Sequence, residues 1–259
     1  MLFAPQEDSN QDESKKSQLL SFLLAGLAFS LFTYFVFAAA DYHWDWSSIY
    51  EYRQKFVNGW LASLLVSLAA LFVSLLVGAA TVIIQKSRFL PLRYSATIYV
   101  ELVRGTPLLV QILFLFYVVA DSLGLDNRYV VGVAALSLFS GAYISEIFRG
   151  AIESVGKSQL QSAKAIGLTH YQTYRYVIFP QALRRSLPAL AGQMANIIKD
   201  SSLLSIIAIR EFTLNAREVS ALTFSSFESY LPLALGYLIL TLPIMRMARV
   251  IEKRIRFET

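Results

Sequence analysis

Residues 57–84 read VNGWLASLLVSLAALFVSLLVGAATVII, a run of 28 residues that contains no Asp, Glu, Lys or Arg. About 20 apolar residues are enough for an α-helix to cross a bilayer, so this run is long enough to span one. Residues 19–40 form a second uncharged run. The whole chain is 56% hydrophobic and 16% charged, whereas soluble domains are about 25% charged. The sequence therefore predicts an all-α protein that crosses a membrane several times.

The hydrophobic pattern predicts about six transmembrane helices, separated by short polar segments. They cover residues 19–40, 57–84, 98–120, 130–148, 183–208 and 230–248. Residues 209–229 have mixed polarity and are expected to form a loop. The aromatic segment Asp41–Phe56 is typical of a membrane interface. For the first helix the alternative is a cleaved signal peptide, because Ala38 and Ala40 form an A-x-A pattern, but its length favours a retained helix.

The distribution of basic residues predicts the orientation in the membrane. With the N-terminal tail, residues 1–18, in the cytoplasm, the cytoplasmic segments hold 16 of the 23 Lys and Arg residues. The outer segments hold 5, and Arg104 and Lys199 lie within helices. Basic residues are concentrated on the cytoplasmic side of membrane proteins, so both termini are expected there. This explains the net charge of +5 without a nucleic-acid partner. The absence of cysteine excludes disulfides and thiolate metal sites.

The cytoplasmic segment 149–182 has an internal pattern that an ordinary loop lacks. Ser158 is placed to cap a helix that Gly167 then ends, because glycine is favoured just past a helix C-terminus. A second helical pattern runs from Thr169 to Phe179, before Pro180. This helix–turn–helix either lies on lipid headgroups or docks a soluble partner. A stretch that resembles a phosphate-binding loop, Gly150 to Ser158, has five residues between its glycines instead of four, so any nucleotide site is expected on another chain.

Five segments together resemble a known family. Residues 157–180, KSQLQSAKAIGLTHYQTYRYVIFP, resemble the cytoplasmic EAA loop of permeases from binding-protein-dependent ATP-binding cassette (ABC) importers. Four more resemble its polar amino acid subfamily, which serves histidine, arginine, glutamate and glutamine. They are ELVRGTPLLVQ at 101–111, SLFSGAYISEIFRGAIESV at 137–155, PQALRRSLPAL at 180–190 and KDSSLLSII at 199–207. The matches keep the family order over residues 57–250.

The resemblance implies a fold and a set of partners. The fold is a type I importer permease core of five helices in residues 57–250, with residues 19–40 as an additional N-terminal helix. The implied partners are a dimer of ATP-binding subunits, a periplasmic or surface solute-binding protein, and a second permease, identical or homologous. The implied location is the cell inner membrane, and no cofactor or catalytic activity is expected. The EAA triplet is Gln161-Ser162-Ala163 here. These residues and Gly167 are expected to couple the permease to the ATPase, although the family Glu and any salt bridge it makes are missing.

Ionisable residues within membrane helices are candidates for function, because burying a charge in lipid is costly. Asp200 lies deep in the fifth predicted helix, and its carboxylate and the hydroxyl of Ser201 are suited to bind the ammonium group of an amino acid. The alternative is that Asp200 pairs with a neighbouring helix. Thr106 is a weaker candidate, since the break at Gly105-Thr106-Pro107 frees backbone groups, and Tyr143 is a further one.

Other polar residues are expected to be structural. Glu101 and Arg104, and likewise Glu146 and Arg149, are three residues apart and are expected to pair. His43 resembles a metal ligand between two aspartates but fits an interfacial aromatic segment better. The alternative function is a secondary transporter driven by an ion gradient. Such transporters usually contain internal repeats, and no clear repeat is found in this chain.

Overall fold

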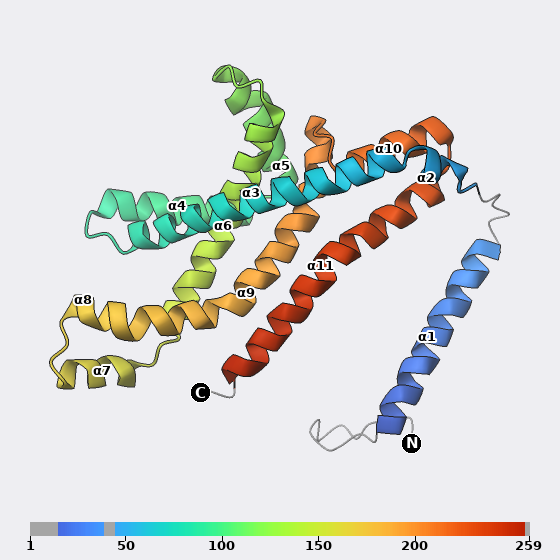
Figure 1. The fold of residues 1–259 in the computed structure, drawn as a ribbon. Coiled ribbons are helices and arrows are strands. Elements are labelled where there is room, and N and C mark those ends of the chain that lie inside the picture. Colours follow the sequence, from blue (N-terminus) through green and yellow to red (C-terminus); the bar gives the residue numbers. More distant parts are fainter. Residues whose placement is uncertain (1–14, 39–44, 257–259) are drawn as a thin grey trace. The chain divides into compact units, whose positions relative to one another are not determined.

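The structure is a computed structural model that describes residues 15–38 and 45–256, and every regular element in these ranges is helical (Figure 1). The chain separates into two compact units, Met1–Asp45 and Trp46–Thr259. The first contains α1, Lys15–Ala38, which begins four residues before the predicted helix. Its apolar part, Leu20–Phe35, is shorter than the other candidate spans. Most of the predicted tail, Ala40 and His43 lie outside the described residues.

The second unit is built around α3, Arg53–Gln85, which follows the short α2, Ser47–Glu51. At 1.5 Å per residue its 33 residues extend to about 50 Å, so both ends reach past a hydrocarbon core of about 30 Å. Its buried face consists largely of small residues, which allow close helix packing in membranes. They include Gly59, Ser63, Ser67, Ala70, Ser74 and Gly78. A Cβ on Gly78 would lie 2.6 Å from the Ile144 side chain, so glycine is required where α3 meets α6.

The third predicted helix is broken, as expected at Thr106, but it is not a single span over 98–120. Helix α4, Leu90–Gly105, meets α5, Leu108–Phe114, at an angle of 112°, and a π-helical segment, η1, Leu115–Ala120, continues α5. Thr106 has extended backbone angles, φ −123° and ψ 148°. Proline disfavours the helical conformation in the residue before it and has no N–H for a helix bond, which explains the break.

Helix α6, Arg128–Glu153, crosses α3 and packs against it, and α9, Phe179–Asp200, packs against α6 and α11. After α9 the chain forms a short 3₁₀ helix, η3, Ser201–Ile207, so the predicted helix 183–208 is wrong beyond Asp200. The predicted loop 209–229 is also wrong, because it contains α10, Phe212–Thr223. Helix α11, Ser226–Arg256, ends the described chain.

Three helices are long and apolar enough to cross a membrane, namely α3, α6 and α11, or four spans if α4 and α5 count as one. Within the described residues, the number of such spans is therefore smaller than the six transmembrane helices that the sequence predicts. α9 does not qualify because its polar residues, among them Gln181, Arg184, Arg185 and Gln193, make it too weakly apolar. It packs against α3, α6 and α11, so these neighbours supply part of the environment that lipid would otherwise provide.

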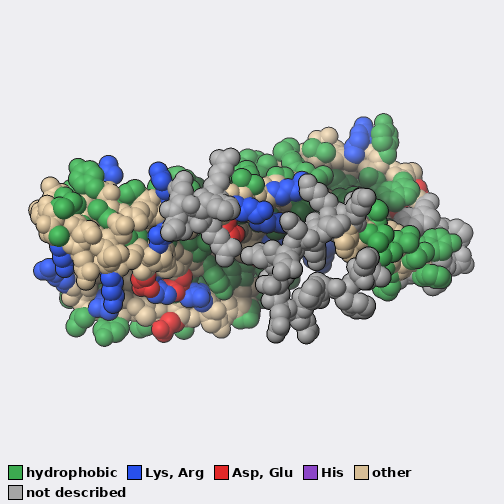
Figure 2. Space-filling view, turned by 90° about the horizontal axis from the view of Figure 1, so that it is seen from below, with side chains coloured by type: hydrophobic (Ala, Val, Ile, Leu, Met, Phe, Trp, Pro, Cys, Tyr) green, Lys and Arg blue, Asp and Glu red, His purple; other side chains and the backbone are tan. Residues whose placement is uncertain are grey.

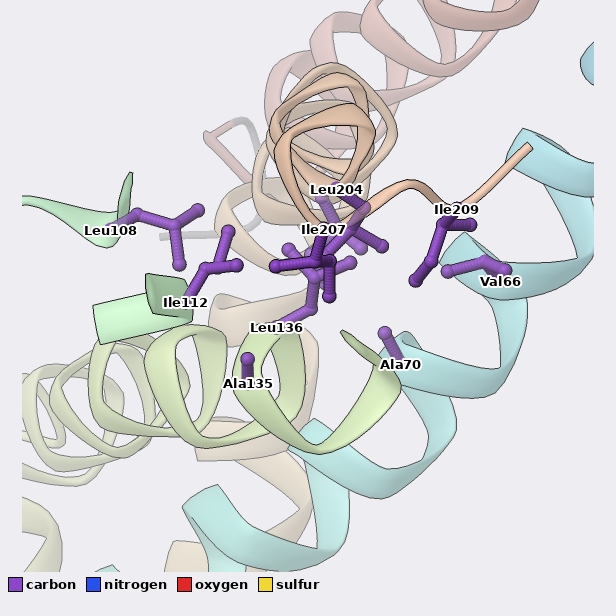
Figure 3. Packing of buried hydrophobic residues seen from close by; sticks show 10 residues of the cluster. Val66, Ala70, Leu108, Ile112, Ala135, Leu136, Leu204, Ile207 and Ile209 are labelled. Carbon is purple, nitrogen blue, oxygen red and sulfur yellow. The ribbon is translucent and has the colours of Figure 1, made fainter. Parts of the chain in front are cut away.

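The main hydrophobic core joins five elements of the second unit (Figure 3). Ile112, Leu136, Ile197 and Ile209 are fully buried in it. Its members come from α3, α5, α6, α9 and η3, together with Ile209 just after η3: Val66, Ala70, Leu108, Ile112, Ala135, Leu136, Ile197, Leu204, Ile207 and Ile209. The core therefore packs the segments just after the two helix breaks, α5 and η3, against each other.

Candidate coupling hairpin and translocation path

The predicted helix–turn–helix between α6 and α9 is present. We call residues 157–178 the coupling hairpin; it comprises α7, Lys157–Ala165, α8, His170–Thr173, and the π-helical η2, Tyr174–Ile178. The α7 helix is capped by Gly156, and Ser158 lies inside it, so the predicted Ser158 cap is wrong. Pro180 does not end the second helix, because Pro180 stands in the first turn of α9, where its missing N–H is tolerated.

The turn of the coupling hairpin has the geometry predicted for Gly167. Gly167 has a φ of +78°, and the N–H groups of Gly167 and Leu168 donate to the carbonyls of Lys164 and Ala163 at 3.0 Å each. These two bonds form a Schellman motif, which satisfies carbonyls at the end of α7. The second helix starts after Thr169, as predicted, and Thr169 and Gln172 form a capping box there. The turn is therefore defined by local hydrogen bonds on both sides.

The coupling hairpin exposes apolar side chains together with part of the triplet. Gln161 and Ser162 are exposed, whereas Ala163 is buried. Ile166 and Tyr171 are each 75% exposed, and Tyr176 is 67% exposed. Lys157, Lys164 and Arg175 are also exposed on this segment. Figure 2 shows Lys and Arg side chains on the side where Figure 1 places α7, α8 and the turn between α3 and α4. A surface of this composition, on a segment that projects from the helices, is typical of a contact site for another protein.

The base of the coupling hairpin is closed by one arginine. Arg185, on α9, donates from Nη1 to the carbonyl of Ser154 and, at 3.1 Å, to its hydroxyl. Ser154 is the C-terminal capping residue of α6. The two helices that enter and leave the hairpin are therefore bonded to each other where it begins, and a displacement of the hairpin acts on both.

At the first helix break, the side chain of Gln111 forms hydrogen bonds with the backbone carbonyls that the break leaves without a helical partner. Its Nε2 lies 2.8 Å from the Val103 carbonyl, 2.8 Å from the Thr106 hydroxyl and 3.2 Å from the Thr106 carbonyl. The Thr106 hydroxyl itself donates to the Leu102 carbonyl at 2.8 Å. Thr106 is exposed, but the side chain of Gln111 already bonds its polar atoms.

At the second break, Asp200 is the last residue of α9, and the helix changes to the 3₁₀ form at Ser201. Asp200 is partly buried, whereas Ser201 is fully buried and donates its hydroxyl to the Ile198 carbonyl at 2.8 Å. The serine hydroxyl is therefore directed to its own helix in this conformation. The elements that follow the two breaks, α5 and η3, pack against each other.

Tyr143 lies on α6 beside a network of charged residues. The guanidinium of Arg104 lies 5.5 Å from the centroid of the Tyr143 ring. Arg104 bonds Glu146 at 3.0 Å across the α4–α6 contact, and Arg149 bonds Glu146 at 2.7 Å and Glu153 at 2.9 Å. The predicted Glu146–Arg149 pair is confirmed. The predicted Glu101–Arg104 pair is wrong, because Arg104 binds Glu146 on the neighbouring helix.

The sequence of this chain matches a known family of transport proteins. The family model of the inner-membrane components of binding-protein-dependent transport systems matches residues 79–257. The chain belongs to this family. The match rejects the alternative of an ion-gradient-driven secondary transporter and makes the chain a permease subunit of an ABC importer.

Curated relatives cover most of the permease. It is 34% identical over 210 residues to the probable glutamine ABC transporter permease protein GlnM of Bacillus subtilis, over 81% of this chain and 97% of the relative. It is also 34% identical over 215 residues to the glutamine transport system permease protein GlnP of Escherichia coli, over 82% of this chain and 98% of the relative.

Solved structures agree with the fold. The structure of an amino acid ABC transporter with histidines superposes with a TM-score of 0.77 and 32% identity, over 82% of the permease and all of that chain. An inward-facing MetNI methionine transporter superposes with a TM-score of 0.65 at 15% identity, over 78% of the permease and 96% of that chain. The second likeness shows a shared fold alone.

Sequence reasoning missed the buried carboxylates of the permease, Glu211 and Glu228, and the contacts of Glu211 show its role. Its Oε1 accepts from the Leu214 N–H at 2.7 Å, and its Oε2 accepts from the Thr213 N–H at 2.8 Å, which caps α10. Oε2 also accepts from Tyr237 of α11 at 3.0 Å and Ser63 of α3 at 3.2 Å. Glu211 therefore joins three helices. Its only sequence signal is an acidic residue directly before an amphipathic segment, which is typical of a helix N-terminus.

Proposed function

We propose that the permease forms one half of the membrane channel of an importer that moves polar amino acids across the cell inner membrane. A dimer of ATP-binding subunits supplies the energy, a solute-binding protein delivers the amino acid, and a second permease, identical or homologous, completes the channel. The observation that carries the proposal is the coupling hairpin, which presents exposed apolar residues. The two core helices that flank the hairpin, α6 and α9, are bonded to each other at its base.

The coupling hairpin receives the movement of the ATP-binding subunits. Gln161, Ser162 and Ala163 lie on α7, and Gly167 orients α7 against the second helix of the hairpin. When the ATP-binding subunits close, α7 moves with them, and the Arg185–Ser154 bonds pass this movement to α6 and α9. Because α6 packs on α3, the rotation of these helices opens the channel alternately to each side.

The amino acid passes the two helix breaks. Broken helices expose backbone groups at their ends, and many transporters bind substrate at such breaks. Asp200 at the second break receives the α-ammonium group or holds the break in the shape that does so, with Ser201, Thr106 and Tyr143 nearby on the path. The amino acid transport named for the relatives supports this class of substrate.

The arrangement in the membrane follows the distribution of basic residues. Both termini and the coupling hairpin lie in the cytoplasm, and the loop between η1 and α6, which contains Asp126, lies outside. Residues 57–250 form the five-helix permease domain, and α1 is an additional N-terminal helix. The ATP hydrolysis site lies on the partner chain.

Site-specific crosslinking tests the docking site. The chain has no cysteine, so Gln161→Cys places one thiol on α7, and Asp126→Cys places one on the opposite side as the matched control. We expect a short bifunctional reagent to join Gln161→Cys, but not Asp126→Cys, to the ATP-binding subunit. Absence of this product, with a crosslink from a cysteine elsewhere on the inner face, would contradict docking at the coupling hairpin.

The substrate class is tested separately in proteoliposomes that contain the complete importer and its binding protein. We expect ATP-dependent uptake of at least one of glutamine, glutamate, histidine and arginine. Uptake restricted to a sugar or a metal ion would contradict the substrate class and leave the docking result unaffected.

A further inference from the structure

Two hollows of different character lie side by side at the end of α3 that carries Lys86. The first, the charged cleft, has a volume of about 450 Å³. It is lined by Val82, Gln85, Lys86, Arg93, Thr97, Val100, Glu101, Arg104, Glu146, Arg149 and Glu153. The second, the apolar groove, has a volume of about 280 Å³. It is lined by Ala79, Val82, Ile83, Phe148, Ala151, Ile152, Tyr174, Ile178, Phe179, Ala182 and Leu183.

The two hollows adjoin each other at two points. Val82 lines both of them. Lys86, which lines the charged cleft, donates from Nζ to the hydroxyl of Tyr174, which lines the apolar groove, at 3.3 Å. The same Nζ lies 5.4 Å from the centroid of the Tyr174 ring. A molecule with an apolar tail and a polar head can therefore occupy the groove and the cleft together.

The charge of the cleft favours an anion near Lys86 and Arg93. Arg104 and Arg149 are neutralised by Glu146 and Glu153. Within the described part of the chain, neither Lys86 nor Arg93 has a carboxylate at salt-bridge distance. Glu101 also lines the cleft, so its four cations and three carboxylates leave one net positive charge.

The lining of the apolar groove suits a hydrocarbon occupant. Its lining is apolar apart from the hydroxyl of Tyr174. Water in such a groove would find too few polar partners to be stabilised. Along α3, the groove residues Ala79 and Ile83 lie three to seven residues before Lys86, which is one to two helical turns. The cations therefore lie at the cytoplasmic membrane surface. The groove lies at the edge of the hydrocarbon layer between α3, α6 and the start of α9, with Tyr174 and Ile178 of the coupling hairpin on its cytoplasmic side.

We propose that these two hollows form a binding site for an anionic phospholipid, with an acyl chain in the apolar groove and the phosphate between Lys86 and Arg93. Basic pockets between membrane helices on the cytoplasmic side bind such headgroups. The site joins the ends of α3 and α6 to η2 of the coupling hairpin. A bound lipid therefore supports the hairpin at the position from which it acts on the core.

Native mass spectrometry of the purified importer, released from nanodiscs of phosphatidylglycerol and phosphatidylcholine in equal amounts, tests the site. We expect the wild type to retain phosphatidylglycerol in preference to phosphatidylcholine. Each basic residue near an anionic lipid contributes about 1 kcal/mol, so the double variant Lys86→Gln, Arg93→Gln should lose about 30-fold in affinity for phosphatidylglycerol. The matched control is Arg249→Gln, an exposed residue of α11 outside both hollows, which should retain the lipid as the wild type does.

A second measurement on the wild type does not depend on the folding of variants. A phosphatidylglycerol with a photoreactive group in its acyl chain should label the groove segments around Ile83 or Ile152. Three results would overturn the proposal. The first is that neither segment is labelled, and the second is that the double variant retains phosphatidylglycerol as well as the wild type does. The third is that a photoreactive residue at position 79 crosslinks to the ATP-binding subunit. The last result would assign the groove to a protein contact.

Discussion

Replacing Glu211 tests how the buried carboxylate holds α3, α10 and α11 together. Glu211→Ala removes four hydrogen bonds. Tyr237 keeps another partner, because it still contacts the Thr213 hydroxyl at 3.0 Å. The Ser63 oxygen still accepts from the Phe212 N–H at 3.1 Å, and its O–H can turn to a carbonyl of its own helix, as serine hydroxyls do in helices. The N–H groups of Thr213 and Leu214 have no such substitute among the described bonds. The variant therefore leaves two donors unsatisfied in the first turn of α10.

The magnitude follows from these two donors. An unsatisfied buried donor costs about 1–3 kcal/mol, so Glu211→Ala should lower the free energy of unfolding by about 2–6 kcal/mol. In Glu211→Gln the amide oxygen can take the place of Oε2 and accept the same three bonds, but the NH₂ group then faces the Leu214 N–H. This variant should lose about 1–3 kcal/mol. The expected order of stability is wild type, Gln, Ala.

Thermal unfolding of the detergent-solubilised importer, followed by size-exclusion chromatography after heating, measures this order. About 2–4 °C per kcal/mol is expected for a chain of this size, so Glu211→Ala should lower the Tm by at least about 4 °C. The matched control is Glu218→Gln on the same helix, which breaks a partly exposed pair with Lys55 at 2.8 Å and should cost at most about 1 kcal/mol. Equal Tm values for Glu211→Ala and Glu218→Gln would refute the reasoning.

Three further predictions concern coupling, substrate and topology. Gly167→Val should assemble but lose transport-coupled ATPase activity, because a Cβ at φ +78° costs about 1–2 kcal/mol; Gly167→Asn, which tolerates this conformation, should keep more activity, and equal coupling in both would reject the role of the turn. Asp200→Asn should lower uptake about 10- to 150-fold through loss of a charge-assisted hydrogen bond, with assembly and basal ATPase activity unchanged. Failure of the variant to accumulate in the membrane would indicate a structural role for Asp200, and normal uptake would exclude both the substrate role and the structural role. A thiol at position 126 should react with a reagent that does not cross the inner membrane when this membrane is intact. Reaction only after the inner membrane is permeabilised would show that the topology is the reverse of the predicted one.

Features that depend on neighbours along the chain could be predicted from the sequence. The apolar run at 57–84 predicts α3 within a few residues. The Gly167 turn, the helix start at Thr169 and the break at Thr106 were also predicted, because each rests on local backbone geometry and on bonds within a few residues. The family resemblance was visible because its motifs are short and keep their order in the chain.

Local rules failed where contacts between distant segments decide the structure. Pro180 is a different case, because it was expected to end a helix and a second local rule, tolerance of proline in the first turn of a helix, applies instead. Arg104 was expected to pair within its own helix, but it binds Glu146 across the α4–α6 contact. Residues 209–229 looked too mixed for a helix, yet α10 forms there because Glu211 caps it and its apolar face packs on α3 and α11.

The sequence by itself determined that this protein is helical, resides in a membrane and carries a helix–turn–helix hairpin before α9, because hydrophobic length and turn chemistry are encoded in consecutive residues. Only the tertiary structure decided that the breaks at Thr106 and Asp200 lead into elements that pack on each other, and that Glu211 joins three helices. Such contacts depend on how helices far apart in sequence pack together, and hydrophobic periodicity within one helix does not specify its neighbours.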